Sequence, residues 1–238
     1  MPVVPPDRQR DALAVIVAAR NEADRIGKTL AAVRQLVPEA ALWVADDAST
    51  DGTAEAAMAA GAQVVSRGRP HGKGANVSAA AAAALSGEPV PDLFLLCDGD
   101  LGDSAAGLAP LVGAVERGEC DLAVAAFSRR VGGGFGVALG FAGWAIRRRC
   151  GLETRAPISG QRAMRVEVLR ASLPFARGYG MEVGMTIDAV RAGYSLREYE
   201  LDLAHRATGR SLAGFAHRAR QLADFARVYL SRRGESGD

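Results

Sequence analysis

Short apolar segments alternate with helical patterns through the first half of the chain, and this alternation is what most constrains the fold. The segment ALAVIVAA (12–19) is apolar without a two-residue alternation, as is typical of a strand buried on both faces of a sheet. Similar segments follow at 41–46, 62–66 and 92–97, and the residues between them are spaced as helices. This order predicts an α/β fold with a mostly parallel, doubly wound sheet and helices on both faces.

The remaining pattern extends this fold over the rest of the chain. Apolar residues at positions 26, 30, 33 and 36 predict a first helix, which Asn21 or Asp24 can cap and which Pro38 ends. We expect further strands at 121–129 and, at the sheet edge, 195–206. Further helices are expected at 53–61, 78–85, 105–116, 166–171 and 211–233, the last being basic and amphipathic. No repeat or linker divides the chain, so we expect a single domain with a C-terminal helix.

Charge, cysteines and hydropathy exclude several classes of protein. A net charge of +2 gives no strong field for nucleic acid, so no nucleic-acid partner is expected. Three scattered cysteines, without a C-x-x-C pair, favour a reducing cytoplasm, and the first eleven residues lack the apolar core of a signal peptide. The glycine-rich segment 131–146, followed by three arginines, is too short to span a bilayer. It could form a mobile loop, a core helix or a peripheral contact with a membrane surface.

Polar clusters follow three of the expected strands, at 20–22, at 46–47 and at 98–100. Because ligands bind at the carboxyl ends of strands in such sheets, we expect these clusters to converge. Asp98 and Asp100 would point to one side and hold Mg²⁺ or Mn²⁺, which usually also binds substrate phosphates. Gly99 would leave room for a diphosphate. The alternative is a turn in which Asp103 or Ser104 caps the next helix.

Other polar residues are candidates for substrate binding. Asp47 can accept hydrogen bonds from a base or ribose, although Asp47 or Ser49 could instead cap a helix. No G-x-G-x-x-G motif follows the first strand, which argues against a nicotinamide or flavin cofactor. Lys73, in RGRPHGKGAN, can hold a phosphate, and the alternative is a solvated basic loop. Glu182 is either an acceptor-site carboxylate or an acid that the helix dipole favours.

Four segments in order, VIVAARNEADRI, WVADDASTDGT, GKGAN and LLCDGDL, resemble the family-2-like glycosyltransferases of the GT-A fold. The resemblance covers residues 12–110 and implies a nucleotide-sugar donor. It implies that Asp47 contacts the base and that Lys73 lies near the nucleotide. Asp98 and Asp100 would lie on the ribose, diphosphate and divalent metal. The nucleoside would be lined by Ala19, Arg20, Asn21 and Glu22.

The second half is distantly similar to glucosyl-3-phosphoglycerate synthases through GYGMEVGMTID and HRATGR. This similarity implies that Glu182 belongs to the acceptor pocket and that His205 completes the metal site. PISGQRAMR (157–165), which we expect to form helix, resembles instead the acceptor loop of polyprenyl-phosphate sugar transferases. The residues that would hold an anionic acceptor are Ser159, Gly160, Gln161, Arg162, Glu182, Arg206 and Arg210.

These expectations describe a metal-dependent glycosyltransferase acting on a small phosphorylated or polyprenyl-phosphate acceptor. Uridine is the preferred donor base and guanosine the next. The chain would comprise a disordered lead (1–11), a donor-binding half (12–110), an acceptor half (111–210) and a C-terminal helix and tail (211–238). Glu182 would act as base if the reaction inverts the anomeric centre, with Asp100 the second catalytic residue. The alternatives are a sugar-phosphate nucleotidyltransferase and a non-catalytic nucleotide-sugar-binding protein, and a homodimer is possible.

Overall fold

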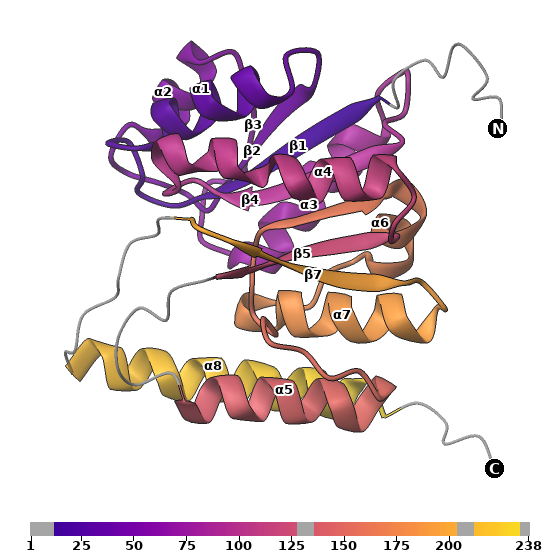
Figure 1. Cartoon of the computed structure of the whole chain (residues 1–238). Coiled ribbons are helices and arrows are strands. Elements are labelled where there is room, and N and C mark those ends of the chain that lie inside the picture. The colour runs from indigo at the N-terminus through magenta and orange to yellow at the C-terminus, as the bar shows by residue number, and fades with distance from the viewer. Residues whose placement is uncertain (1–11, 128–135, 204–211, 234–238) are drawn as a thin grey trace, which may run out of the picture.

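The computed structural model of the chain describes residues 12–127, 136–203 and 212–233 (Figure 1). One seven-stranded sheet has the order β3-β2-β1-β4-β6-β5-β7. Only β6 runs antiparallel to its neighbours, β4 and β5. The sheet combines strands from both halves of the chain, as expected for a single α/β domain. Its strands are β1 (Leu13–Ala19), β2 (Ala41–Asp46), β3 (Gln63–Ser66), β4 (Leu93–Asp98), β5 (Leu122–Phe127), β6 (Arg162–Arg165) and β7 (Leu196–Leu201).

Helices cover both faces of the sheet, because successive residues of each central strand point to opposite sides. Val15 and Val17 of β1 pack with the first group of helices, and Ala14 and Ile16 pack with the second. The first group is α1 (Ile26–Leu36), α2 (Thr53–Ala59), the 3-10 helix η1 (Gly102–Leu108) and α4 (Ala109–Glu116). The second is α3 (Lys73–Leu85), α6 (Val166–Ser172), the 3-10 turn η2 (Gly178–Gly180) and α7 (Met181–Arg191).

Two further helices form an outer layer on α7. Figure 1 shows α5 (Gly136–Cys150) and α8 (Leu212–Ser231) side by side, on the far side of α7 from the sheet. Their inner residues make a separate apolar cluster with Val183 and Ile187 of α7. The part of the glycine-rich segment from residue 136 onward is therefore helix. Within the described residues, no helix is both long and apolar enough to cross a membrane.

Several local predictions were wrong. PISGQRAMR does not form helix, because Arg162–Arg165 is the strand β6 between β4 and β5. The third helix starts at Lys73 instead of residue 78. It follows Gly72, whose positive φ of 83° turns the backbone just before the helix begins. The expected helix at 105–116 is a 3-10 helix up to Leu108 and an α-helix only beyond it. Neither Asn21 nor Asp24 caps α1, whose N-cap position is Arg25 without a side-chain hydrogen bond.

Candidate active site

The three polar strand ends converge, as the sequence predicts. In the register of the parallel sheet, Ala19 at the end of β1 pairs with Asp46 at the end of β2. Ala18 pairs with Asp98 at the end of β4. The three carboxyl ends therefore lie at one edge of the sheet, where α/β proteins bind their ligands.

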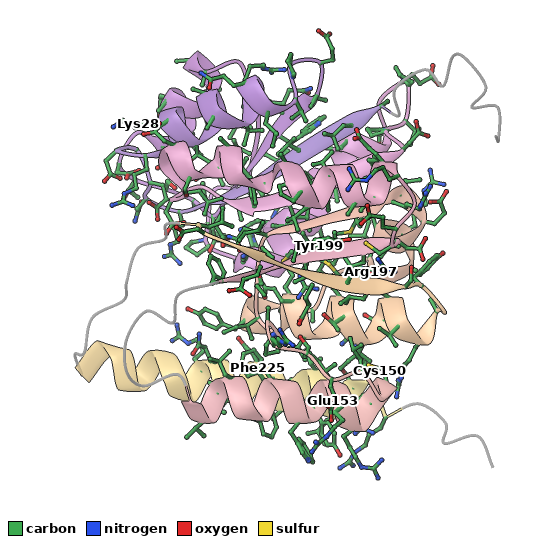
Figure 2. The ribbon with its side chains drawn as sticks, in the orientation of Figure 1. Lys28, Cys150, Glu153, Arg197, Tyr199 and Phe225 are labelled. Carbon is green, nitrogen blue, oxygen red and sulfur yellow. The ribbon has the colours of Figure 1, made fainter. Side chains whose placement is uncertain are left out.

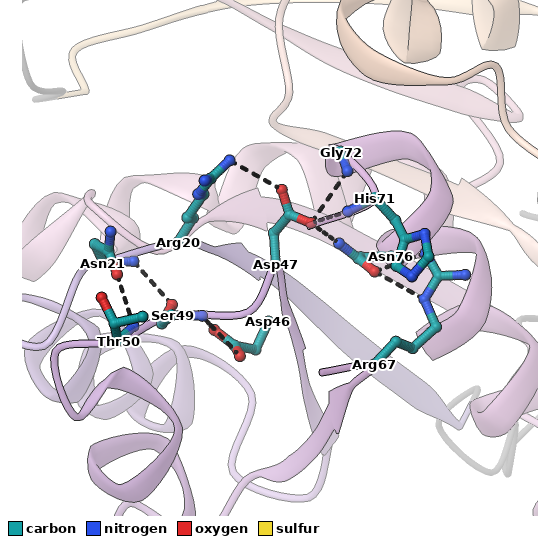
Figure 3. Close-up of polar contacts among 10 residues, drawn as sticks. All are labelled: Arg20, Asn21, Asp46, Asp47, Ser49, Thr50, Arg67, His71, Gly72 and Asn76. Carbon is teal, nitrogen blue, oxygen red and sulfur yellow. Dashed lines mark hydrogen bonds and ion pairs between the residues drawn. The ribbon is translucent and has the colours of Figure 1, made fainter. Parts of the chain in front are cut away.

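Asp47 fixes the loop that precedes α3 (Figure 3). Its Oδ1 accepts hydrogen bonds from the backbone N–H of His71 at 2.7 Å and of Gly72 at 3.1 Å, and from Nδ2 of Asn76. Its Oδ2 lies 3.5 Å from NH1 of Arg20. Asp47 therefore does not cap α2, which begins after Gly52 without a side-chain cap. It joins the end of β2 to the start of α3.

A second set of contacts joins the segments after β1 and β2 (Figure 3). The backbone N–H of Asn21 donates to Oγ of Ser49 at 2.8 Å, and Oδ1 of Asn21 accepts from the N–H of Thr50 at 2.9 Å. Asn21 has a positive φ of 55°, which asparagine tolerates better than most side chains. Asp46 accepts from Oγ of Ser66 at 2.9 Å. Arg20 thereby lies beside Asp47, and Asn21 is tied to the segment that follows Asp47.

Lys73 joins the two halves of the chain. Its Nζ lies 2.6 Å from Oδ1 of Asp98 and 2.9 Å from Oε1 of Glu182. Lys73 is the first residue of α3, and Glu182, which is only 5% exposed, lies in the first turn of α7. Burial by itself would lower the pKa of Lys73, but the two carboxylates outweigh it and hold the pKa above its usual value. The lysine is therefore a positive charge shared by two acids.

The turn after β4 is held by α1. Oγ1 of Thr29 donates to the carbonyl of Gly99 at 2.8 Å and accepts from the N–H of Gly102 at 2.8 Å. A Cβ on Gly99 would meet Ile26 and the carbonyl of Ala18 at 3.2–3.3 Å, so packing alone gives one reason for this glycine. The capping alternative for this segment is wrong, because η1 begins without a side-chain cap.

The predicted acceptor loop closes over Asp98. Nε2 of Gln161 donates to Oδ2 of Asp98 at 2.7 Å, and Oγ of Ser159 lies 3.2 Å from Oε1 of Gln161. A Cβ on Gly160 would collide with Nζ of Lys73 and lie 2.9 Å from Oδ2 of Asp98. A larger residue at 160 would force the ends of the Lys73 and Asp98 side chains to move, and so disturb their ion pair.

Arg162 lies inside the protein, with 1% of its surface exposed. Its Nε donates to the carbonyl of Ser159 at 2.8 Å, and its NH1 donates to Oγ1 of Thr186 at 2.9 Å. Thr186 Oγ1 in turn donates to the carbonyl of Glu182 at 3.0 Å. Burial lowers the pKa of Arg162 to about 10, so the guanidinium remains charged at neutral pH. Arg162 thus links the acceptor loop to the helix that carries Glu182.

The donor atoms at this edge fit a hard divalent cation. Asp98 and Asp100 offer the carboxylate oxygens that Mg²⁺ and Mn²⁺ prefer. Within the described residues, no three His, Cys, Asp or Glu side chains form a ready metal cluster. The ammonium of Lys73 already places positive charge beside Asp98. Because Oδ1 and Oδ2 of Asp98 already contact Lys73 and Gln161, a cation bound here would need further ligands from outside the protein, such as substrate phosphates.

Three predicted site residues, His205, Arg206 and Arg210, lie outside the described residues. Residues that hold the site together were missed, among them Asn76 and Thr29. Asn76 bonds Asp47 and also accepts from Nε and NH2 of Arg67, at 3.0 and 2.8 Å. Thr29 pins the turn after β4. Asn76 carries a detectable signal, since it is a polar residue on the inward side of an alanine-rich helix, one turn after Lys73.

Comparison with solved structures supports the GT-A fold. Glucosyl-3-phosphoglycerate synthase from Mycobacterium tuberculosis, in complex with phosphoglyceric acid, superposes with a TM-score of 0.74 and 30% identity. The match covers 95% of this chain and 82% of that structure. The same enzyme in complex with Mn²⁺, UDP-glucose and phosphoglyceric acid gives a TM-score of 0.73, 31% identity and the same coverage.

Sequence comparison agrees with this result. Glucosyl-3-phosphoglycerate synthase of Mycolicibacterium paratuberculosis is 33% identical over 202 residues, which are 74% of this chain and 59% of that relative's length. Undecaprenyl-phosphate mannosyltransferase of Micrococcus luteus is 31% identical over 212 residues, covering 82% of this chain and 85% of that protein. A sequence model of the family described as glycosyl transferase family 2 matches residues 14–172. The chain therefore belongs to glycosyl transferase family 2.

Proposed function

We propose that the chain transfers a sugar from a nucleoside-diphosphate sugar, with UDP the preferred nucleotide and GDP the next, to a phosphorylated acceptor. The observation that carries this proposal is the cluster of Lys73, Asp98 and Glu182, closed by Gly160 and Gln161. It brings the expected donor residues and the expected acceptor residues to one point. The solved relative was captured with Mn²⁺, UDP-glucose and phosphoglyceric acid, which supports a uridine donor and an anionic acceptor.

Each residue then has a defined task. Asp47, Arg20 and Asn21 shape the nucleoside side, and Asp98 and Asp100 would hold Mn²⁺ or Mg²⁺. The bound cation would neutralise the leaving diphosphate. Gln161 and Lys73 orient Asp98, and Glu182 faces the acceptor side. If the reaction inverts the anomeric centre, Glu182 takes the proton of the acceptor group; if it retains, no base is needed there.

Two acceptor chemistries share the phosphate group. A small phosphorylated acid is favoured by the match to the phosphoglycerate enzymes, and a polyprenyl phosphate by the relative from Micrococcus luteus. Arg206 and Arg210 for the acceptor, and His205 as a third metal ligand, remain predictions from the resemblance. A cytoplasmic location and a homodimer remain predictions as well.

The test is a transfer assay with UDP-glucose or GDP-mannose, with Mn²⁺ or EDTA, and with 3-phosphoglycerate or undecaprenyl phosphate as acceptor. We expect release of a nucleoside diphosphate that requires the metal and one of the acceptors. Asp100→Asn should lower kcat by about 10²–10⁴-fold, and Glu182→Gln should do the same if the reaction inverts the anomeric centre, whereas the exposed Asp24→Asn control should not. Release of pyrophosphate from a nucleoside triphosphate and a sugar phosphate would instead identify a nucleotidyltransferase. Donor binding without turnover for any acceptor would favour a binding protein.

A further inference from the structure

The outer surface of α5 and α8 is unusually apolar for an exposed surface. Val137 is 75% exposed, Trp144 is 41% exposed and Leu230 is 48% exposed. The inward side of the same two helices is already used, because it packs on α7 around Phe225, which Figure 2 shows between α8 and the rest of the protein. The exposed apolar residues therefore lie on the side that faces away from the domain. We call this surface the outer face and define it by Val137, Trp144, Tyr229 and Leu230.

Aromatic rings run across the outer face from one helix to the other. The ring centroids of Phe141 and Trp144 are 5.4 Å apart, and those of Trp144 and Tyr229 are 4.8 Å apart. The guanidinium of Arg149 lies 3.7 Å above the ring of Tyr229. Tryptophan and tyrosine, with an apolar body and a polar tip, are the side chains enriched where protein meets the membrane–water boundary.

Positive charge borders the outer face. Arg147, Arg148 and Arg149 lie in the last turn of α5, Arg227 lies about one turn before the end of α8, and Arg233 follows that helix. In Figure 2, side chains with blue nitrogen tips extend below this end of α5, near the labelled Cys150 and Glu153. Among the residues that the structure describes, two acids pair with these cations: Glu153, 3.7 Å from Arg147, and the buried Asp224, 2.6 Å from Arg227. The border therefore has an excess of positive charge.

Helix dipoles account for only part of this arrangement. Cations near a helix C-terminus offset the dipole, which is sufficient reason for arginines at the end of α5. It gives no reason for an exposed tryptophan one turn earlier, or for Val137 and Leu230. Apolar side chains beside a row of arginines are the pattern of a helix that lies in the interface of an anionic membrane.

We propose that the outer face docks on an anionic lipid bilayer, with α5 and α8 lying along its surface. Val137, Trp144 and Leu230 enter the headgroup region, and Arg147 and Arg148 contact lipid phosphates. A second copy of the chain is the weaker occupant, because self-association would bring two basic borders together in one interface. The proposal does not rest on glycosyl transfer and applies with either acceptor.

The chain has a built-in reporter for this contact. It contains two tryptophans, Trp43 and Trp144, so the variant Trp43→Phe leaves Trp144 as the single source of tryptophan emission. The probe is a vesicle of phosphatidylcholine and phosphatidylglycerol whose acyl chains carry bromine, which quenches tryptophan on contact. We expect strong quenching with these vesicles, weak quenching with brominated phosphatidylcholine alone, and reversal at high salt because exposed charges are screened.

Charge variants separate docking from general attraction. Arg147→Glu/Arg148→Glu, in the Trp43→Phe background, should weaken vesicle binding at least tenfold. Lys28→Glu/Arg170→Glu makes the same change in net charge at exposed positions away from the outer face, and should change binding by less than threefold. Figure 2 shows Lys28 on the opposite side of the protein from α5 and α8. Circular dichroism serves as the control that each variant is folded.

Three results would overturn the proposal. One is the absence of quenching with anionic vesicles while the protein remains folded. The second is self-association in the absence of lipid that Trp144→Ser abolishes, together with no vesicle binding, which would assign the outer face to a second copy. The third is equal loss of binding in the two charge variants, because binding would then depend on net charge and not on this face.

Discussion

The ammonium of Lys73 lies 2.6 Å from Oδ1 of Asp98, and this contact joins the start of α3 to the end of β4. The same ammonium is 2.9 Å from Glu182 at the start of α7. Two acids from different halves of the chain are thus held together by one cation. Without that cation, the carboxylates would face each other across a partly buried space, and like charges so placed raise the free energy of the folded state.

Lys73→Met should therefore destabilise the protein and impair transfer. Because about a third of each of the Lys73 and Asp98 side chains is exposed, we expect a loss of about 1–2 kcal/mol in the free energy of unfolding, less than for a fully buried pair. The raised pKa of Lys73 means that its stabilising effect is fully present below pH 10.5, its ordinary value, and is lost only at higher pH. Urea unfolding at pH 7 and pH 9 should show the same difference from wild type. Lys28→Met is the exposed control and should change stability by less than about 0.5 kcal/mol.

Gly160 provides a second test of the same site. Gly160→Ala places a methyl group against Nζ of Lys73 and Oδ2 of Asp98, so we expect a loss of about 1–3 kcal/mol in stability and weaker donor binding. Gly140→Ala is a matched control, because a Cβ there meets nothing within 4 Å and the residue lies within α5. Alanine should stabilise that helix by about 0.5–1 kcal/mol. Melting temperatures and titration with UDP measure both effects. An unchanged Gly160→Ala protein would show that the loop does not pack on the Lys73–Asp98 pair.

The predictability of this site differs between its parts for a physical reason. The strands β1, β2 and β4 could be predicted because burial on both faces removes polar residues from them, and their register then aligned Asp46 and Asp98. The strand β6 could not be, because four residues of mixed polarity fit a helix as well as a strand. Pairing with β4 and β5 makes this segment a strand. In that position Ala163 packs in the core on one face of the sheet and Met164 in the core on the other face.

Contacts between distant parts of the chain could not be predicted from the sequence either. Nothing in the pattern around Lys73 or Glu182 shows that α3 and α7 start side by side. The sequence assigns Arg162 to the acceptor and does not predict its burial, which follows from its place in a central strand. Glu198 of β7 was not noticed either, although its carboxylate accepts hydrogen bonds from the backbone of Arg155 and Ala156 and so holds the acceptor loop in place.

Protonation of His71 should lower the free energy of unfolding in mild acid. Partial burial, together with Arg67 and Arg69, lowers the pKa of His71 below its ordinary 6.5, so the fold favours the neutral imidazole. The unfolded chain then takes up a proton first as the pH falls. The stability that the neutral form contributes is present above pH 6.5 and is lost below it. We expect His71→Gln to lose less stability than wild type between pH 7.5 and pH 5, measured as the midpoint of urea unfolding. Parallel curves for the two proteins would contradict the lowered pKa. The backbone N–H of residue 71, which bonds Asp47, is retained in this variant.

Variants of Arg162 can show whether this residue supports the site or contacts the acceptor directly. Arg162→Met keeps much of the side-chain volume but leaves the carbonyl of Ser159 and Oγ1 of Thr186 without their donors. We expect a loss of about 1–3 kcal/mol in stability, partly offset because a buried charge is removed. If Arg162 only holds the loop and α7, kcat should fall by more than tenfold while KM for the acceptor stays within about threefold. If the guanidinium binds the acceptor directly, KM should rise strongly while stability changes little. The 1% exposure of Arg162 favours the first result. Arg162→Lys, which retains the charge but has one nitrogen for two acceptors, should give intermediate stability and kcat under the first reading.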